Sequence, residues 1–435
     1  DCAHMAHAPR PKAGVFAVRA APVLKHNLRV ALAGGAMRHF KPQRHYLKLI
    51  SLGGKRALAE KFGVVVEGAA LWQWKDRIDR AFMDRLSDLP EMIPARPAGQ
   101  VAKGADRHAK PMCAGCGAKV GSGVLRDALQ ALPPVTGDVV TSAGDDAAVL
   151  RLPGGVYQVL STDHLRGFVA DPFVMTQIAA VHALGDVWAM GAQPQVALAS
   201  VVLPQMSPQM QARYMAQITQ AATSVLGKAG AQLVGGHTTM GAELTIGFTV
   251  TGTSETPPLT LAGAQEGDAL VLTRPLGSGV ILAAEMQGKA SGRDVAAMLA
   301  LMAAPQGETA AVLGQRARAM TDVTGFGLAG HVAAMGRASG LAAVLWQNEI
   351  VAYDGARALV ERGVASTLMP ANRADAPVEG IEDPLLHDPQ TAGGLLAAMS
   401  LEDAEKAVAQ IGPQARVIGV LQAGVAGQIS LQASR

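Results

Sequence analysis

The sequence predicts an α+β protein of two subdomains that follow a smaller N-terminal segment. From Cys113 onward, short β-rich runs alternate with helices rich in Ala and Met. A stretch rich in Pro, Gly, Ala and Lys after residue 92 is typical of a linker. A second stretch, residues 255–266, has the proline and polar content of a domain junction. The expected divisions are therefore 1–92, 93–112 (linker), 113–255 and 256–435.

Composition limits the classes of function. The net charge of +3, with 17% charged residues, gives no sign of a nucleic-acid-binding stripe or an acidic tail. Three cysteines cannot build a disulfide framework, which indicates a reducing, cytoplasmic setting. No apolar run has the 18 or so residues that a membrane span needs, and no signal peptide opens the chain. Because the first residue is Asp1 rather than Met, we expect a piece of a longer polypeptide.

The segment 1–92 is basic and contains an amphipathic helical pattern over 71–89. We favour packing of this helix on its own domain or on a partner, with peripheral membrane contact as the alternative. Its apolar positions are Leu71, Trp74, Ile78, Phe82, Leu86 and Leu89.

The later elements follow in order. Residues 156–163 predict a strand that ends at a carboxylate, and 244–253 and 269–273 predict two further strands. Residues 172–190 predict a helix, with Asp171 as its N-cap and Pro172 at the first helical position.

The loop around Cys116 holds the most reactive group in the sequence. Cys113 and Cys116 lie beside Lys119 among small residues that permit close approach to a ligand. A neighbouring ammonium is expected to lower the thiol pKa toward neutrality. A zinc site lacks further well-spaced ligands, and a thioredoxin-like pair lacks its βαβ context. We therefore favour a nucleophilic or chalcogen-binding thiolate over both alternatives.

Aspartates beside glycine, or at the ends of apolar runs, form a second group of candidates. Mg²⁺ prefers carboxylate oxygens together with substrate phosphates. Each aspartate alone could be an ordinary turn or cap residue, but together they indicate a metal–nucleotide site. His182 shares a helix face with Asp186, and a solvated helix face is the alternative there. The four places are 144–147, 161–163, 185–186 and 321–325.

Two glycine motifs need separate interpretation. Gly235, Gly236 and His237 follow the apolar run 232–234. Two interpretations stay open: the strand ends here with backbone N–H groups that bind phosphate, or the glycines form an ordinary hairpin turn. Residues 325–330 match the dinucleotide fingerprint, with Glu349 at a suitable distance. We reject that match because 319–322 is too short and polar for a preceding strand. These glycines are expected to open a helix that continues past His331.

Residues 113–435 resemble selenophosphate synthetase (selenide, water dikinase) in a series of ordered motifs. The resemblance implies the two-subdomain fold of aminoimidazole ribonucleotide synthetase. Its most specific part is the loop Gly115-Cys116-Gly117-Ala118-Lys119. The other matching motifs are 145–149 (DDAAV), 161–163 (STD), 178–191 (IAAVHALGDVWAMG), 235–237 (GGH), 272–277 (LTRPLG), 320–327 (MTDVTGFG) and 388–394 (DPQTAGG).

The same resemblance implies the site residues and the reaction. Cys116 would be catalytic, with Lys119 beside it at the ATP phosphates. Members of the family convert ATP, selenide and water into selenophosphate, AMP and phosphate for selenocysteine and selenouridine synthesis, as homodimers that could receive selenium from a delivery protein. The implied Mg²⁺ ligands are Asp146, Asp186 and Asp322. The implied ATP contacts are Lys119, Ala143, Gly144, Asp145, Asp163, Asp186, Gly235, Gly236 and His237.

Two alternatives to this function remain. The chain could be another ATP-dependent kinase or synthetase of the same superfamily, such as a thiamine-monophosphate kinase. It could also have a non-enzymatic role within a flavoprotein. Residues 1–92 resemble the C-terminal end of a flavin-dependent NADH dehydrogenase-like domain. The resemblance is carried by Asp1-Cys-Ala and by residues 10–22 and 26–28. FAD would then bind only the intact fusion, because both glycine-rich nucleotide motifs of that family are missing here.

Overall fold

The computed structural model describes residues 5–87 and 113–435, with short gaps, and the chain divides into two compact units, Asp1–Met92 and Ile93–Arg435. Asp1 and Ala143, which the sequence assigned to flavin and ATP contacts, lie outside the described residues. The gaps are His7, Lys12, Ser122, Val124, Arg126, Asp127, Gln130, Ser142 and Ala143.

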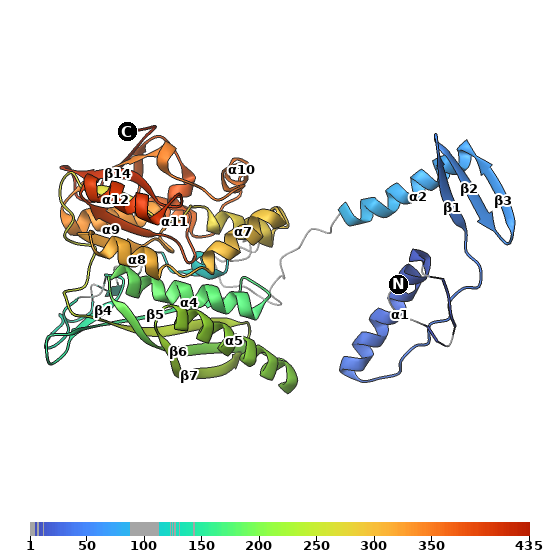
Figure 1. Ribbon diagram of the computed structural model, residues 1–435, viewed down its shortest axis with the longest axis horizontal. Coiled ribbons are helices and arrows are strands. Elements are labelled where there is room, and N and C mark those ends of the chain that lie inside the picture. The colour runs from blue at the N-terminus through green and yellow to red at the C-terminus, as the bar shows by residue number, and fades with distance from the viewer. Residues whose placement is uncertain are drawn as a thin grey trace, which may run out of the picture. The chain divides into compact units, whose positions relative to one another are not determined.

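The described residues of the first unit form an antiparallel three-stranded sheet and two helices (Figure 1). The predicted amphipathic helix is confirmed as α2, but Trp74, Ile78 and Phe82 on its apolar face are 44–50% exposed. Within the described residues this face is therefore only partly covered by its own unit, and packing on a partner, the other part of the hypothesis, stays a prediction. Leu89 lies outside the described residues. The elements are α1 (Gly14–Ala33), β1 (Lys48–Gly53), β2 (Arg56–Lys61), β3 (Val64–Gly68) and α2 (Ala69–Ser87).

The second unit begins with a subdomain built on a mixed five-stranded sheet. The strand order is β4-β5-β8-β6-β7, and the pairings are antiparallel except for the parallel pair β6–β7. The strands predicted at 156–163 and 244–253 are confirmed as β5 and β8. The elements are η1 (Gly115–Ala118), β4 (Ala148–Arg151), β5 (Tyr157–Arg166), α4 (Pro172–Ala189), β6 (Gln193–Pro204), α5 (Pro208–Lys228), β7 (Gln232–Gly241) and β8 (Thr245–Ser254).

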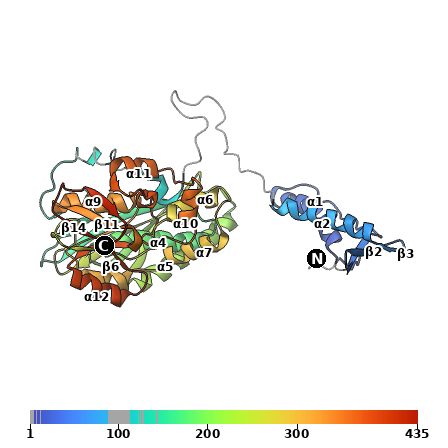
Figure 2. The ribbon, with the colours of Figure 1, turned by 90° about the horizontal axis from the view of Figure 1, so that it is seen from above.

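Helix α4 lies between this sheet and the C-terminal subdomain (Figure 1), and Figure 2 shows the same elements from above. It begins as predicted, because the Asp171 side chain accepts hydrogen bonds from the backbone N–H groups of Phe173 and Val174. Both sides of the helix are covered, and His182 is 1% exposed. The hypothesis of a solvated face for His182 is therefore wrong, and polar groups on α4 point into the protein.

The C-terminal subdomain contains a mixed seven-stranded sheet in the order β10-β13-β9-β14-β11-β15-β12. The strand predicted at 269–273 is confirmed as β9. The strands are β9 (Ala269–Leu272), β10 (Ala319–Asp322), β11 (Ala342–Trp346), β12 (Val378–Gly380), β13 (Leu395–Met399), β14 (Arg416–Gln422) and β15 (Ile429–Gln432). The helices are α6 (Ser278–Met286), α7 (Gly292–Met302), α8 (Gly307–Gly314), α9 (Gly327–Ser339), α10 (Ala356–Glu361), α11 (Met369–Asp375) and α12 (Leu401–Ile411), with short 3₁₀ turns η2 (Gln347–Glu349) and η3 (Pro384–His387).

One strand contradicts the sequence analysis. Residues 319–322, which we judged too short and polar, form the buried edge strand β10, antiparallel to β13. It is stable there because the hydroxyl of Thr321 finds partners inside the protein. The helix expected after it is confirmed as α9, which contains His331.

Strand β7 is a second correction. It does not end at Gly235 but continues to Gly241, paired with β6 along its length. The glycine pair is explained by close packing, because a Cβ on Gly236 would lie 2.0 Å from the carbonyl oxygen of Ala199 on β6. Its φ of +154° also favours glycine.

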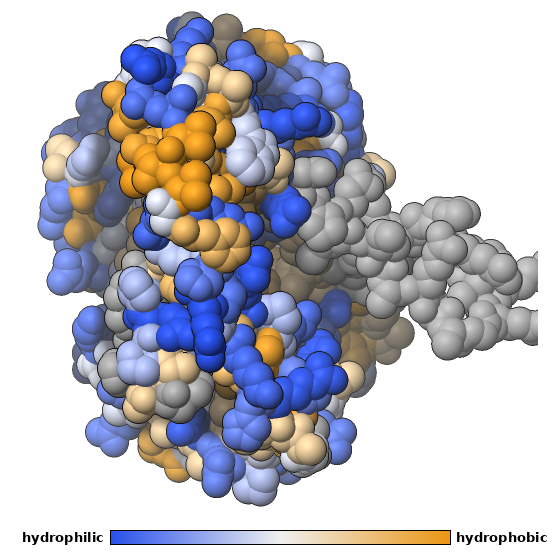
Figure 3. All heavy atoms as spheres, turned by 90° about the vertical axis from the view of Figure 1, so that its right-hand side faces the viewer, coloured by the Kyte–Doolittle hydropathy of each residue, from blue (hydrophilic) through white to orange (hydrophobic). Residues whose placement is uncertain are grey.

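The surface is mixed in character. On the face in Figure 3, apolar side chains gather in one patch in the upper half, and hydrophilic side chains cover much of the rest. Among the described residues no single helix is long and apolar enough to cross a bilayer. One bent pair, α7 with α8, reaches that length and composition only when its two helices are taken together.

Candidate active site

The loop that carries Cys116 is folded onto the C-terminal subdomain. Its turn η1 starts at Gly115, whose φ is +62° and whose Cα faces the Thr391 hydroxyl. The Cys116 backbone N–H donates to Thr391 Oγ1 at 3.1 Å, and the Thr367 hydroxyl donates to the Gly117 carbonyl at 3.0 Å. Both threonines are far along the chain, so the position of the thiol depends on the contact between the subdomains.

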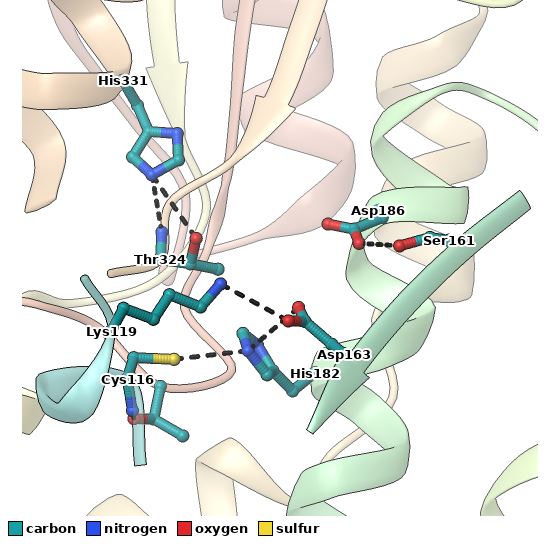
Figure 4. A network of polar contacts seen from close by, with 9 residues as sticks. Cys116, Lys119, Ser161, Asp163, His182, Asp186, Thr324 and His331 are labelled. Carbon is teal, nitrogen blue, oxygen red and sulfur yellow. Dashed lines mark hydrogen bonds and ion pairs between the residues drawn. The ribbon is translucent and has the colours of Figure 1, made fainter. Parts of the chain in front are cut away.

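Cys116, Lys119, Asp163 and His182 form one group of contacts (Figure 4). Lys119 Nζ lies 3.5 Å from Asp163 Oδ1. His182 Nε2 lies 3.2 Å from Asp163 Oδ2 and 3.3 Å from Cys116 Sγ. The stem of Lys119 crosses Gly325, where a Cβ would lie 2.8 Å from Lys119 Cδ. The structure therefore brings the predicted thiol, ammonium and β5 carboxylate together.

The expected activation of the thiol is not found in the structure. Burial raises the pKa of Cys116 to about 12, although the nearby Lys119 ammonium and the hydrogen bond with Thr391 lower it. The negative charges of Asp163 and Asp322 add to the increase. The prediction of a pKa near neutrality is therefore wrong, because it counted the cation and not the desolvation of a fully buried sulfur.

Three aspartates from three elements meet beside this group. Asp146 precedes β4, Asp186 lies on α4 and Asp322 ends β10, and one ligand atom of each lies within 4.8 Å of the others. Burial, and then neighbouring carboxylates, raise the pKa of all three well above the usual value. Asp186 accepts a short hydrogen bond from Ser161. Hard oxygen donors around one point, with excess negative charge, are what a divalent cation such as Mg²⁺ requires.

The carboxylate of Asp146 is held by a chain of hydrogen bonds from α9. The Thr324 N–H donates to His331 Nε2 at 3.0 Å, so in the neutral ring the proton lies on Nδ1. Nδ1 lies 3.3 Å from Thr321 Oγ1, which donates to Asp146 Oδ1 at 2.8 Å. Burial lowers the pKa of His331 to about 3, so the ring is neutral. Asp146 Oδ2 is buried without a hydrogen-bond partner among the described residues, as suits a metal ligand.

These groups line a cavity of about 770 Å³, large enough for a nucleotide. Gly144 and Asp145 line it from the N-terminal subdomain, and Phe326 and His331 from the C-terminal one. A second cavity of about 630 Å³ shares Gly144, Asp145 and Phe326. The predicted side chains that share the first cavity are Lys119, Asp145, Asp146, Asp163, Asp186 and Asp322.

Gly235, Gly236 and His237 are not brought to this cavity within the described part of the chain. They lie on the exposed edge strand β7, and β8 and β6 separate them from β5, which carries Asp163.

The sequence alone does not assign His331, Thr321, Thr391 or a role for His182. His182 and Thr321 lie inside motifs already recognised, and His331 follows one by four residues. For His182 the available signal was a polar residue within an otherwise apolar motif, but its partner could not be known before folding.

The comparisons with known proteins agree with this architecture. The family model "AIR synthase related protein, N-terminal domain" matches residues 144–254, and its C-terminal counterpart matches 265–432. A selenide, water dikinase of Myxococcus xanthus is 37% identical over 333 residues, which are 72% of this chain and 94% of the relative. That of Burkholderia pseudomallei is 35% identical, covering 68% of this chain and 87% of the relative.

A solved thiamine-monophosphate kinase from Stenotrophomonas maltophilia K279a has a similar fold, with a TM-score of 0.53. It is 20% identical, and the match covers 71% of this chain and 96% of that one. The expected aminoimidazole ribonucleotide synthetase-like fold is confirmed. Neither of the two matching family models covers residues 1–143.

Proposed function

Because the chain belongs to the selenide, water dikinase family, we propose that it uses this cavity to make selenophosphate from ATP, selenide and water, with release of AMP and phosphate. The observation that carries the assignment of the site is the convergence of Cys116, Lys119 and the aspartate trio from two subdomains. A thiol beside an ammonium is suited to handling selenide, the soft nucleophile that accepts the phosphoryl group, and clustered carboxylates are suited to binding a triphosphate through a metal ion.

Asp146, Asp186 and Asp322 would hold Mg²⁺, and their donor set fits it. The ion would neutralise phosphate charge during transfer. Lys119 supplies a fixed positive charge at the cavity wall, oriented by Asp163. Gly144 and Asp145 contribute to a wall that the nucleotide would contact. The second cavity, with Leu261, Phe326 and Ala334, suits a purine base.

We also propose that the enzyme is a homodimer through the edge strand β7. Leu198, Val234 and Met240 on β6 and β7 are 47–56% exposed, and an exposed apolar edge strand favours pairing with another chain. A second copy could then bring Gly235, Gly236 and His237 to the nucleotide. Delivery of selenium by another protein, and action in the cytoplasm, remain part of the proposal. The buried thiols Cys113 and Cys116, which are free, suit a reducing compartment.

The first unit is proposed to be the C-terminal remnant of a flavin-dependent oxidoreductase domain. Its helices and strands leave many apolar side chains exposed, among them Leu28, Leu32 and Val65, as expected of part of a larger core. The chain alone should then not retain FAD. Absorbance near the flavin band after mixing with FAD and gel filtration tests this, and stoichiometric retention would contradict it.

The activity is tested by anaerobic phosphorus NMR with ATP, selenide and Mg²⁺. We expect selenophosphate, AMP and phosphate from the wild type, none above background from Cys116→Ser, and full activity from the matched control Cys113→Ser. ADP formed without a need for selenide would favour the kinase alternative. An active Cys116→Ser variant would remove the assigned role of that thiol.

A further inference from the structure

His182 is a buried group that the assignment above does not use. It lies on α4, and its Nε2 atom faces two groups from different elements: Cys116 Sγ at 3.3 Å and Asp163 Oδ2 at 3.2 Å (Figure 4). Its other ring nitrogen, Nδ1, is buried and has no hydrogen-bond partner among the described residues. Every polar contact that the structure gives this ring is therefore made through one atom.

These contacts determine where the ring proton lies. Burial, opposed by Asp163 and assisted by the Lys119 ammonium, lowers the pKa of His182 to about 4, so the imidazole is neutral near pH 7. A neutral imidazole has one N–H. On Nε2 the proton can be donated to the Asp163 carboxylate and the Cys116 sulfur. On Nδ1 it would have no acceptor, and the lone pair of Nε2 would then face the carboxylate and the sulfur, which are both electron-rich. The proton therefore belongs on Nε2.

We propose that His182 is a neutral hydrogen-bond donor to the Cys116 sulfur and favours its thiolate form, with Asp163 fixing the orientation of the ring. This inference deepens the proposed function and rests on the assignment of Cys116 as the reactive thiol. Because Nε2 already carries a proton, His182 is not the group that receives the thiol proton, which passes to solvent base when the S–H bond breaks.

The need for such a donor follows from the surroundings of the sulfur. A fully buried thiolate has lost its hydration, which is why the pKa of Cys116 is high. Hydrogen bonds to an ionised acceptor are about twice as strong as those to a neutral one, so an N–H directed at Sγ favours ionisation. The charged groups that act on this thiol are Lys119 after η1, Asp163 on β5 and Asp322 on β10, of which only Lys119 is favourable.

The test is the pH dependence of Cys116 alkylation by iodoacetamide, read by mass spectrometry of the full chain in the absence of substrates. His182→Leu removes the donor, His182→Gln keeps an N–H on a side chain of similar reach, and His164→Gln on β5 is an exposed control. A hydrogen bond to a charged acceptor corresponds to about one to two pKa units. We expect His182→Leu to alkylate about tenfold to a hundredfold more slowly at a fixed pH below the midpoint, and His182→Gln to stay within about threefold of wild type.

The readout separates ionisation from access. A wider site would raise the alkylation rate, whereas loss of the donor lowers it. An unchanged or raised rate in His182→Leu overturns the proposal, and so does a loss of rate in His182→Gln as large as that in the Leu variant, which would indicate a proton acceptor. If the variants do not fold, histidine-selective nitrogen NMR of the wild type decides, since a proton on Nδ1 also overturns it. None of these outcomes depends on selenophosphate formation, which Cys116→Ser tests separately.

Discussion

Replacing Asp322 with Asn should stabilise the protein when no divalent metal is present. Asp322 is 3% exposed, and one ligand atom each of Asp146, Asp186 and Asp322 lies within 4.8 Å of the others. Burial and the charge of Asp146 raise the pKa of Asp322 well above its usual value, against the effect of Lys119. A carboxyl whose pKa is raised on folding stabilises the fold at low pH, and this contribution is lost as the pH rises through the folded-state pKa.

The magnitude follows from the separation. Two unit charges 4.8 Å apart repel by about 3.5 kcal/mol at an effective dielectric constant of about 20. Partial protonation of the aspartates relieves some of this repulsion. Asp322→Asn should therefore raise the free energy of unfolding by about 1–3 kcal/mol at pH 8 in EDTA, and by less at pH 6, where more of the wild-type carboxyl is protonated. With Mg²⁺ this advantage should shrink by about 2.7 kcal/mol, the stabilisation that a bound ligand at a hundred times its Kd adds to the wild type, and the order reverses wherever the gain in EDTA is smaller than this.

The assay is thermal unfolding at pH 6 and pH 8, with EDTA or with Mg²⁺ and a non-hydrolysable ATP analogue. Asp354→Asn, at an exposed aspartate outside the cluster, is the control and should leave both midpoints unchanged. If Asp322→Asn is less stable than wild type in EDTA at pH 8, the like-charge argument is refuted. If the variant still gains the full Mg²⁺ stabilisation, Asp322 is not a ligand.

Three further substitutions test two close contacts in the site and one exposed apolar face. Thr321→Val breaks the hydrogen-bonded link between His331 and Asp146 and should weaken Mn²⁺ binding by about tenfold, measured by paramagnetic resonance. Thr321→Ser keeps the hydroxyl and should bind Mn²⁺ as the wild type does. Equal Mn²⁺ affinities of Thr321→Val and the wild type would contradict the role of the link. Gly185→Ala should lower both metal affinity and activity, because the new Cβ would lie 2.4 Å from Asp322 Oδ2; wild-type titration curves would refute this. Leu198→Asp should give monomers in light scattering if β6 and β7 form the proposed interface, and an unchanged mass would exclude that face.

Local chemistry made much of the fold predictable. The helix α4 could be read from Asp171, Pro172 and an apolar run, because capping and the first-turn proline act within a few residues. The strands β5, β8 and β9 followed from β-rich runs in the same way. The strand β10 was missed because its polar residues are stabilised only by partners such as Asp146, 175 residues away in sequence.

The same distinction applies to the site. Which residue types carry the chemistry was visible in Cys116, Lys119 and the aspartates, but their protonation was not. The thiol pKa was predicted in the wrong direction because a neighbouring lysine is visible in sequence, whereas complete burial of the sulfur arises from packing across two subdomains. The contact of His182 with Cys116 joins residues 66 positions apart, and no spacing rule could have indicated it.

The pair Gly235 and Gly236 shows how one motif can meet two demands. Within the chain, close approach of the β6 backbone requires glycine at 236, since a Cβ there would overlap Ala199. That requirement alone explains the glycine without any ligand. It does not explain why the strand lies exposed at the sheet edge beside Val234 and Met240, with its backbone open to a second chain. A dimer through β7 would cover these apolar side chains and could also deliver the glycines to a partner's nucleotide, so the packing role and the binding role do not compete.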